Sequence, residues 1–409
     1  MRRLRSLELL RGFGVMLMVF LHGALYHYGS LQQLDLSNPP LIVTLIGFLL
    51  MWGGLFAVLS GAAHAIRAVE RLDRGAAVPT VRRWEWLSGG GYVVLGITYF
   101  TLVGPPLIDL AAGTRDSSLV VGLIQFGDLE APSLARWLYM NTLFMIGFST
   151  LLVAPLFAWL AQRHDPRSPR FRWLIAALAF LALVTSWLRI PLYPLYEQAA
   201  AEGRTSFLLL SFWLVNKNDP MWPALGLTLC GTLLGLVSVG RAEPGRLRLP
   251  IGLGVLLLAT GIAGWIFGPP SMLRRSIDTT WLSITLAQAG FMLLGLAGFH
   301  QWLDGARQTT APDGPFTRTL RRFSRASLSV LFGETIVSEV VARGLEALAS
   351  GWNRSLTAAV LFGLGSAGVW AIILARWERT NYRGSIEQGW VRVMGALGRP
   401  STRLDGAAG

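Results

Sequence analysis

The chain has 409 residues, of which 53% are hydrophobic and only 14% are charged, and its mean hydropathy is +0.49. Soluble domains carry about 25% charged residues, so this composition excludes an ordinary soluble fold and predicts an integral membrane protein. The net charge of +13 comes from basic clusters between apolar runs, a distribution that argues against nucleic-acid binding. The single cysteine, Cys230, allows neither an internal disulfide nor a cysteine-based metal site.

The N-terminal segment begins with basic residues and runs into an apolar stretch, as a secretory signal peptide does. It lacks a small-x-small cleavage site after a short apolar core, and Arg11 and His22 interrupt the apolar stretch. We therefore expect this segment to remain uncleaved as the first membrane helix.

Ten segments are long and apolar enough to cross a hydrocarbon core about 30 Å thick, which takes roughly 20 residues per helix. We expect an all-α, polytopic membrane protein with a single transmembrane domain over residues 1–385 and a cytoplasmic tail over residues 386–409. The predicted spans lie at approximately 7–28, 41–65, 86–104, 136–160, 172–190, 221–240, 249–268, 280–301, 326–346 and 356–376.

Basic residues are distributed unevenly between the two sides of these predicted spans. With the N-terminus inside, the inner loops and the tail hold about 26 basic residues, against about nine in the outer loops. Cytoplasmic loops carry an excess of Lys and Arg, and a missed or invented helix would break the alternation from that point onward. The distribution therefore predicts a multi-pass protein of the inner, cytoplasmic membrane with both termini in the cytoplasm.

The two longest outer loops, about 105–135 and 191–220, contain acidic residues with proline, glycine, tyrosine and tryptophan between them. Loops longer than about 12–15 residues in a compact protein are often functional. These two either cover an extracytoplasmic opening or serve as solvated connectors.

The first predicted span contains three ionisable residues, Glu8, Arg11 and His22. Arg11 and His22 are eleven positions apart, which turns a helix by only about 20° net, so they share one face roughly 16 Å apart along the axis. Glu8 lies three residues before Arg11, within pairing distance. Arg11 near the cytoplasmic end could instead snorkel to the headgroups, and His22 could form a purely structural hydrogen bond between helices.

The ninth predicted span carries Glu334 near the midplane of the membrane and Glu339 about a turn and a half further out. A buried carboxylate requires a partner, and Arg11 or His22 could supply it. In a functional interpretation, Glu334 orients His22 or accepts a proton from it. Whether the first and ninth spans touch is left open by the sequence.

The remaining histidines do not suggest a metal site. His27 is expected at the outer interface beside two tyrosines, His64 and His300 near cytoplasmic helix ends, and His164 in a basic loop. None of them has metal-ligand spacing with another histidine, so no metal is predicted.

Four short motifs, in order along the chain, resemble those of the bacterial membrane acyltransferase superfamily. They are Arg11, Gly12 and His22 in LRGFGVMLMVFLHG; Phe56, Leu59, Ser60 and Gly61; the segment FSRASLSVLFGE; and the tail segment WERTNYRGSIEQGWVR. The superfamily includes the type-three acyltransferases and the heparan-α-glucosaminide N-acetyltransferase-like proteins, and the tail is similar to that of an uncharacterised bacterial branch. The sequence departs from the late motif at Leu331, where tyrosine is usual, and at Glu334, where histidine or glutamine is frequent.

The resemblance implies transfer of an acyl group, commonly acetyl, from cytoplasmic acyl-CoA to an extracytoplasmic acceptor such as a glycan or a lipid-linked saccharide. By position, His22 would be the general base or a transient acyl carrier, with Glu334 beside it in the catalytic set. Arg11, together with Ser60 and Gly61, would bind the donor. An imidazole suits this chemistry because its pKa lies near neutrality, and an arginine suits a donor that bears phosphates.

Two other functions fit the same residues. A transporter or flippase of a small or lipid-linked solute could use Arg11, Glu334 and His22 as a charge relay, although no internal repeat is evident. A membrane scaffold or sensor would use these polar groups only to pair helices.

Overall fold

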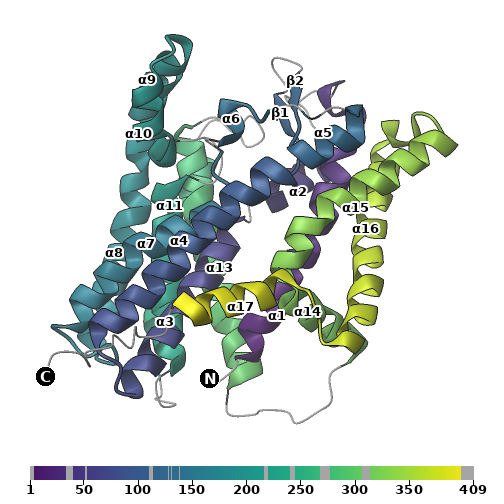
Figure 1. Cartoon of the computed structure of the whole chain (residues 1–409). Helices are drawn as coiled ribbons and strands as arrows, with labels where there is room; N and C mark the ends of the chain where they lie inside the picture. Colours follow the sequence, from purple (N-terminus) through teal and green to yellow (C-terminus); the bar gives the residue numbers. More distant parts are fainter. Residues whose placement is uncertain are drawn as a thin grey trace, which may run out of the picture.

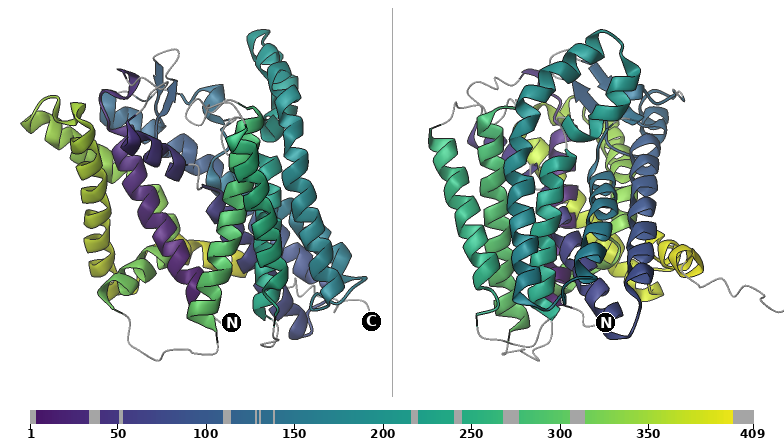
Figure 2. Two further views of the ribbon diagram at one scale, coloured as in Figure 1. Left: turned by 180° about the vertical axis from the view of Figure 1, so that it is seen from behind. Right: turned by 90° about the vertical axis from the view of Figure 1, so that its left-hand side faces the viewer.

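The computed structural model describes residues 4–33, 40–50, 53–109, 114–127, 129, 131–137, 139–215, 220–239, 245–267, 277–305 and 314–397. Within these residues the fold is helical, apart from one short antiparallel pair, β1 (Leu107–Asp109) and β2 (Thr114–Asp116). Long helices run side by side between the two ends of the molecule (Figures 1 and 2), and α1 begins at the lower end in Figure 1.

The helices vary from single short turns to 26 residues. In chain order they are α1 (Arg5–Tyr26), α2 (Leu41–Leu50), α3 (Gly54–Asp73), α4 (Val78–Leu102), α5 (Leu119–Phe126), α6 (Leu134–Trp137), α7 (Thr142–Ala161), α8 (Pro169–Thr185), α9 (Arg189–Ala201), α10 (Thr205–Val215), α11 (Met221–Val239), α12 (Arg248–Ile266), α13 (Thr279–Asp304), α14 (Pro315–Arg325), α15 (Ser327–Leu348), α16 (Leu356–Trp377) and α17 (Ile386–Leu397). Short 3₁₀ turns lie at Leu31–Gln33, Ser186–Leu188, Trp352–Arg354 and Glu378–Thr380.

Seven helical segments in the described part of the chain are long and apolar enough to cross a membrane. They overlap seven of the ten spans predicted from the sequence, and they indicate a multi-pass membrane protein. The segments are Arg5–Tyr26, Thr142–Ala161, Pro169–Ala201, Met221–Val239, Arg248–Ile266, Thr279–Asp304 and Leu356–Thr380.

The other three predicted spans, 41–65, 86–104 and 326–346, are helical but less uniformly apolar. The first was expected to be one helix, and it is instead two, α2 and α3. The second lies within α4 and the third within α15. Helices α3, α4 and α15 each carry several charged residues. They include Arg67, Glu70 and Arg71 in α3, Arg82, Arg83 and Glu85 in α4, and Glu334, Glu339 and Arg343 in α15.

The prediction of a loop over residues 191–220 is wrong. The helical segment that starts at Pro169 continues through α9 as far as Ala201, and α10 follows it. Gly203, whose φ is +67°, reverses the chain between α9 and α10, a backbone conformation that glycine adopts without steric cost. The two prolines of α9 suggested a loop. One of them lies in the first turn of α9, where a missing N–H is tolerated, so it does not prevent a helix.

Helices α3 and α11 pack with their backbones close together. A Cβ added at Gly61 would collide with the carbonyl oxygen of Thr228, and one added at Gly231 would collide with that of Val58. Small residues at helix interfaces permit such an approach and favour van der Waals packing between membrane helices. Helix α11 is accordingly among the most buried parts of the molecule.

The last described helix, α17, begins at the predicted boundary of the tail. It packs against α4 and α15, and it crosses the other helices near the lower half of the molecule in Figure 1. Residues 398–409 of the predicted tail lie outside the described residues.

Adding a methyl group at Gly231 tests the packing of α3 on α11. We expect Gly231→Ala to lower the thermal unfolding temperature of the purified protein, because overpacking a tight interface costs about 1–3 kcal/mol. The matched control is Gly295→Ala in α13, where an added Cβ meets nothing within 4 Å. Equal unfolding temperatures for the two variants would contradict the close approach of the two helices.

Candidate functional site

His22 and Glu334 form a hydrogen-bonded pair between α1 and α15. Nδ1 of His22 lies 2.7 Å from Oε1 of Glu334. The Glu334 side chain is 1% exposed, whereas that of His22 is 19% exposed, so part of the imidazole remains accessible. The two residues are far apart in the sequence, and the structure therefore answers the question that the sequence left open: the first and ninth predicted spans are in contact.

Three further polar side chains surround this pair. The hydroxyl of Thr335 donates to Oε1 of Glu334 at 3.2 Å. Tyr99 of α4 is buried and close enough to interact electrostatically with Glu334. The ring of Tyr26 packs against His22 with ring centroids 5.2 Å apart. Together they make a polar centre within an apolar helix assembly.

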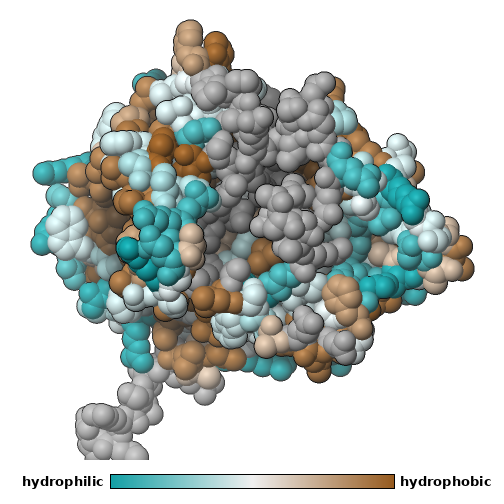
Figure 3. Space-filling view, turned by 90° about the horizontal axis from the view of Figure 1, so that it is seen from above, coloured by the Kyte–Doolittle hydropathy of each residue, from teal (hydrophilic) through white to brown (hydrophobic). Residues whose placement is uncertain are grey.

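A cavity of about 490 Å³ lies at the C-terminal ends of α1 and α15, and Tyr26 forms part of its wall. Glu339 is buried at this wall, where Nε2 of Gln125 donates to its Oε1 at 2.5 Å and Nε2 of His27 lies 3.7 Å from its Oε2. Arg343 also lines the cavity. Figure 3 looks onto this end of the molecule and shows hydrophilic surface on the side where α15 ends and α16 begins.

Arg11 lies toward the other end of α1, about 16 Å from His22 along the helix axis. Its Nε donates to the hydroxyl of Ser324 at 2.9 Å. Charged groups from two other helices, Arg67 of α3 and Glu387 of α17, are close enough to interact with it electrostatically. The residue itself is exposed, and these neighbours show that α3, α14 and α17 all bring polar groups near it.

Glu8 has ion-pair partners on α14. Its carboxylate oxygens lie 3.6 Å from Nε of Arg321 and 3.8 Å from Nε of Arg325. The pairing with Arg11 that helical spacing permits is a weaker electrostatic contact. Glu8 therefore ties α1 to α14 rather than serving the polar centre.

The other two predicted donor-binding residues, Ser60 and Gly61, lie on α3. Gly61 takes part in the close packing against α11 described above, and it lines a small cavity together with His64. The predicted role of Ser60 and Gly61 in donor binding stays a prediction.

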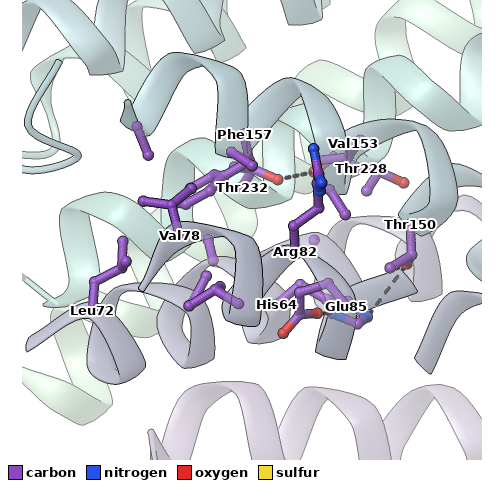
Figure 4. A pocket seen from close by; sticks show the side chains of 17 residues that line it. His64, Leu72, Val78, Arg82, Glu85, Thr150, Val153, Phe157, Thr228 and Thr232 are labelled. Atoms are coloured by element: carbon purple, nitrogen blue, oxygen red, sulfur yellow. Dashed lines mark hydrogen bonds and ion pairs between the residues drawn. The ribbon is translucent and has the colours of Figure 1, made fainter. Parts of the chain in front are cut away.

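A second imidazole–carboxylate pair occupies this small cavity, at His64 and Glu85 (Figure 4). Nδ1 of His64 contacts Glu85 directly, and NH1 of Arg71 donates to Oε1 of Glu85 at 2.9 Å. The hydroxyl of Thr150 lies 3.3 Å from Nε2 of His64. Both His64 and Glu85 are buried, so this network joins α3, α4 and α7 from within, and the sequence analysis did not single out Glu85.

The tail segment and the late motif, which the sequence presents as two signatures, form one structural unit. Glu387 of α17 accepts hydrogen bonds from the backbone N–H of Leu328 at 2.6 Å and of Ser329 at 3.1 Å, and from the Ser329 hydroxyl at 2.7 Å. A carboxylate at a helix N-terminus satisfies otherwise unpaired N–H groups and complements the helix dipole. Glu387 thus fixes the start of α15, the helix that carries Glu334.

Asn141 has a structural role at the start of α7. It caps α7 by accepting from the N–H groups of Leu143 and Phe144, and it donates to the carbonyl of Gly96 at 2.8 Å. Sequence reasoning missed Tyr99, Thr335 and Gln125. Each is an uncharged residue in or beside an apolar run, so no local pattern distinguishes it from an interfacial one.

A scan of protein-family models finds none that matches the chain, and a search of curated proteins finds no match. The acyltransferase resemblance therefore stays a prediction drawn from the motifs.

Removing the Glu387 cap tests the link between α17 and α15. We expect Glu387→Ala to destabilise the protein by about 1–2 kcal/mol, the usual cost of losing a helix N-cap, and to lower its unfolding temperature. Arg392→Ala on the exposed face of α17 is the matched control. An unchanged unfolding temperature for Glu387→Ala would show that α15 does not depend on this cap.

Proposed function

We propose that this protein is a membrane acyltransferase that moves an acyl group, acetyl in the simplest case, from cytoplasmic acyl-CoA to an extracytoplasmic glycan or lipid-linked saccharide. The observation that carries the proposal is the 2.7 Å contact between His22 and the buried carboxylate of Glu334. The motif in which Arg11 and Gly12 precede His22 supports it.

The pair has the arrangement that a general base requires. With Nδ1–H donating to Glu334, the other ring nitrogen of His22 carries a lone pair and can accept a proton. In the proposed reaction it takes the proton of an acceptor hydroxyl while the oxygen attacks the thioester carbonyl. The C–S bond then breaks, and the proton passes to the departing CoA sulfur. Glu334 stabilises the imidazolium formed between these steps, as carboxylates do beside catalytic histidines.

The proposal also assigns directions across the membrane. Arg11 would face the phosphates of a cytoplasmic donor, and the cavity beside Tyr26 and Glu339 would admit the acceptor from the outside. This requires both termini in the cytoplasm and ten spans, with α3, α4 and α15 crossing alongside the seven more apolar segments. A transporter or flippase that uses the polar groups along α1 as a charge relay is the second candidate.

Cysteine accessibility tests the orientation. In a Cys230→Ala background, Arg163→Cys and Ser350→Cys place single thiols at opposite ends of the molecule, both at exposed positions. In intact cells, we expect a membrane-impermeant maleimide to label Ser350→Cys and to label Arg163→Cys only after the cells are opened. The reverse pattern would contradict the orientation.

Substitution of His22 tests the chemistry. We expect His22→Ala to lose at least about 10²-fold of the transfer rate from radiolabelled acetyl-CoA to envelope glycolipid, the usual contribution of a general base. Glu334→Gln should also slow the transfer, because an amide does not stabilise the imidazolium as a carboxylate does. His164→Ala, in the connection between α7 and α8, is the control and should retain the wild-type rate.

Two outcomes would contradict the proposal. One is wild-type acetyl transfer by His22→Ala at equal expression. The other is a purified wild-type protein that neither binds acetyl-CoA nor transfers its acetyl group, yet moves a labelled lipid-linked saccharide across reconstituted vesicles, which would favour the flippase.

A further inference from the structure

A groove of about 1180 Å³ lies between α4, α7 and α17, away from the polar centre. Its walls are mainly apolar, and they include two tryptophans, Trp86 of α4 and Trp390 of α17. The apolar lining comprises Trp86, Leu87, Val94, Leu95, Trp390 and Val393, with others beside them.

The glycine-rich part of α4 produces this groove. Gly89 brings α4 against the backbone of α7 at Gly147, and Gly91 makes room for the ring of Trp390 from α17. Gly90, between them, lines the groove, and a Cβ added there would meet nothing within 4 Å. Gly89 thus permits contact with α7, Gly91 permits contact with α17, and Gly90 leaves an open channel between the two contacts.

Two arginines stand at one end of the groove. Arg82 and Arg83 are both exposed and both line it. Arg82 also lines the small cavity beside His64 and Glu85 (Figure 4), so Arg83 is the arginine that faces this groove alone. Among the described residues neither forms an ion pair with a carboxylate. Val94, at the other end, is twelve residues further along α4, which corresponds to about 18 Å of helix. An amphiphile has a polar head and an apolar chain. The arginines at one end of the groove suit an anionic head, and the long apolar channel suits a chain.

We propose that this groove binds one anionic phospholipid of the bilayer, with its phosphate on Arg83, Arg82 beside it, and an acyl chain along Gly90 and Val94. A water-soluble ligand fits poorly, because the channel is apolar and α17 exposes Val391 and Val393 beside it, as a helix does that lies against lipid. Tryptophans are favoured at the level of the headgroups, where Trp86 would lie. Arginines attract anionic headgroups at this surface.

The site has a consequence for the polar centre. A lipid chain between α4 and α17 would hold α17 in place, and α17 supplies the Glu387 carboxylate that caps α15. The lipid would therefore support the helix that carries Glu334 without touching Glu334 itself.

Photocrosslinking of the full-length protein tests the site. Wild-type protein in phosphatidylcholine nanodiscs receives a trace of phosphatidylglycerol with a photoactivatable acyl chain, and peptide mass spectrometry locates the adducts. We expect adducts in the peptides that cover 86–95 and 386–397, and we expect excess unlabelled phosphatidylglycerol to compete where phosphatidylcholine does not.

Two variants remove the two halves of the site. Gly90→Leu fills the channel, and Arg82→Gln with Arg83→Gln removes its positive charge; each should reduce these adducts about tenfold or more. Gly298→Leu, at another glycine with open space around its Cβ, and Arg170→Gln, at an exposed arginine of α8, are the matched controls and should keep the adducts.

Two results would overturn the proposal. Adducts spread equally over the peptides of α12 and α13 would show only general contact with bilayer lipid. Adducts that palmitoyl-CoA displaces and phosphatidylglycerol does not would assign the groove to an acyl donor instead.

Discussion

A carboxylate buried among membrane helices must have a partner, because an unpaired charge in a medium of low polarity costs several kcal/mol. Glu334, whose side chain is 1% exposed, meets this requirement through His22 at 2.7 Å and Thr335 at 3.2 Å. The contact fixes α1 against α15 at one depth. The other polar groups of the region are placed relative to it, with Arg11 toward one end of α1 and Glu339 at the cavity near the other end.

Several separate ion pairs and hydrogen bonds fix the positions of α1 and α15. Glu8 binds α1 to the arginines of α14, and Asp304 of α13 accepts from the backbone N–H groups of Arg5 and Ser6 at 2.8 and 3.2 Å. Glu387 caps α15. None of these residues belongs to the polar centre, but each fixes the position of a helix that does. Precise placement of a base and its carboxylate needs such support, because small displacements weaken catalysis strongly.

Much of this could be predicted from the sequence, and the exceptions have physical reasons. Apolar length predicted ten spans, and seven of them coincide with helical segments long and apolar enough to cross a membrane. This measure works because crossing a bilayer requires a minimum run of apolar residues. The same measure gave a single helix for 41–65, where the structure has α2 and α3, and a loop for 191–220, where it has α9 and α10. Apolar length alone does not locate helix ends within or beside a span. His22 and Glu334 stood out as costly in a membrane, yet their contact depends on helix packing, which has no local signature. His64 was expected near a cytoplasmic helix end and Glu85 was not singled out, because only the packing of α3, α4 and α7 buries them.

Nitrogen-15 NMR of the purified protein labelled at histidine measures directly whether Glu334 holds His22 through Nδ1. We expect Nδ1 of His22 at neutral pH to show the shift of a protonated, hydrogen-bonded nitrogen, and Glu334→Gln to change this shift while the other four histidines keep theirs. A His22 signal that is the same in wild-type protein and in Glu334→Gln would contradict it.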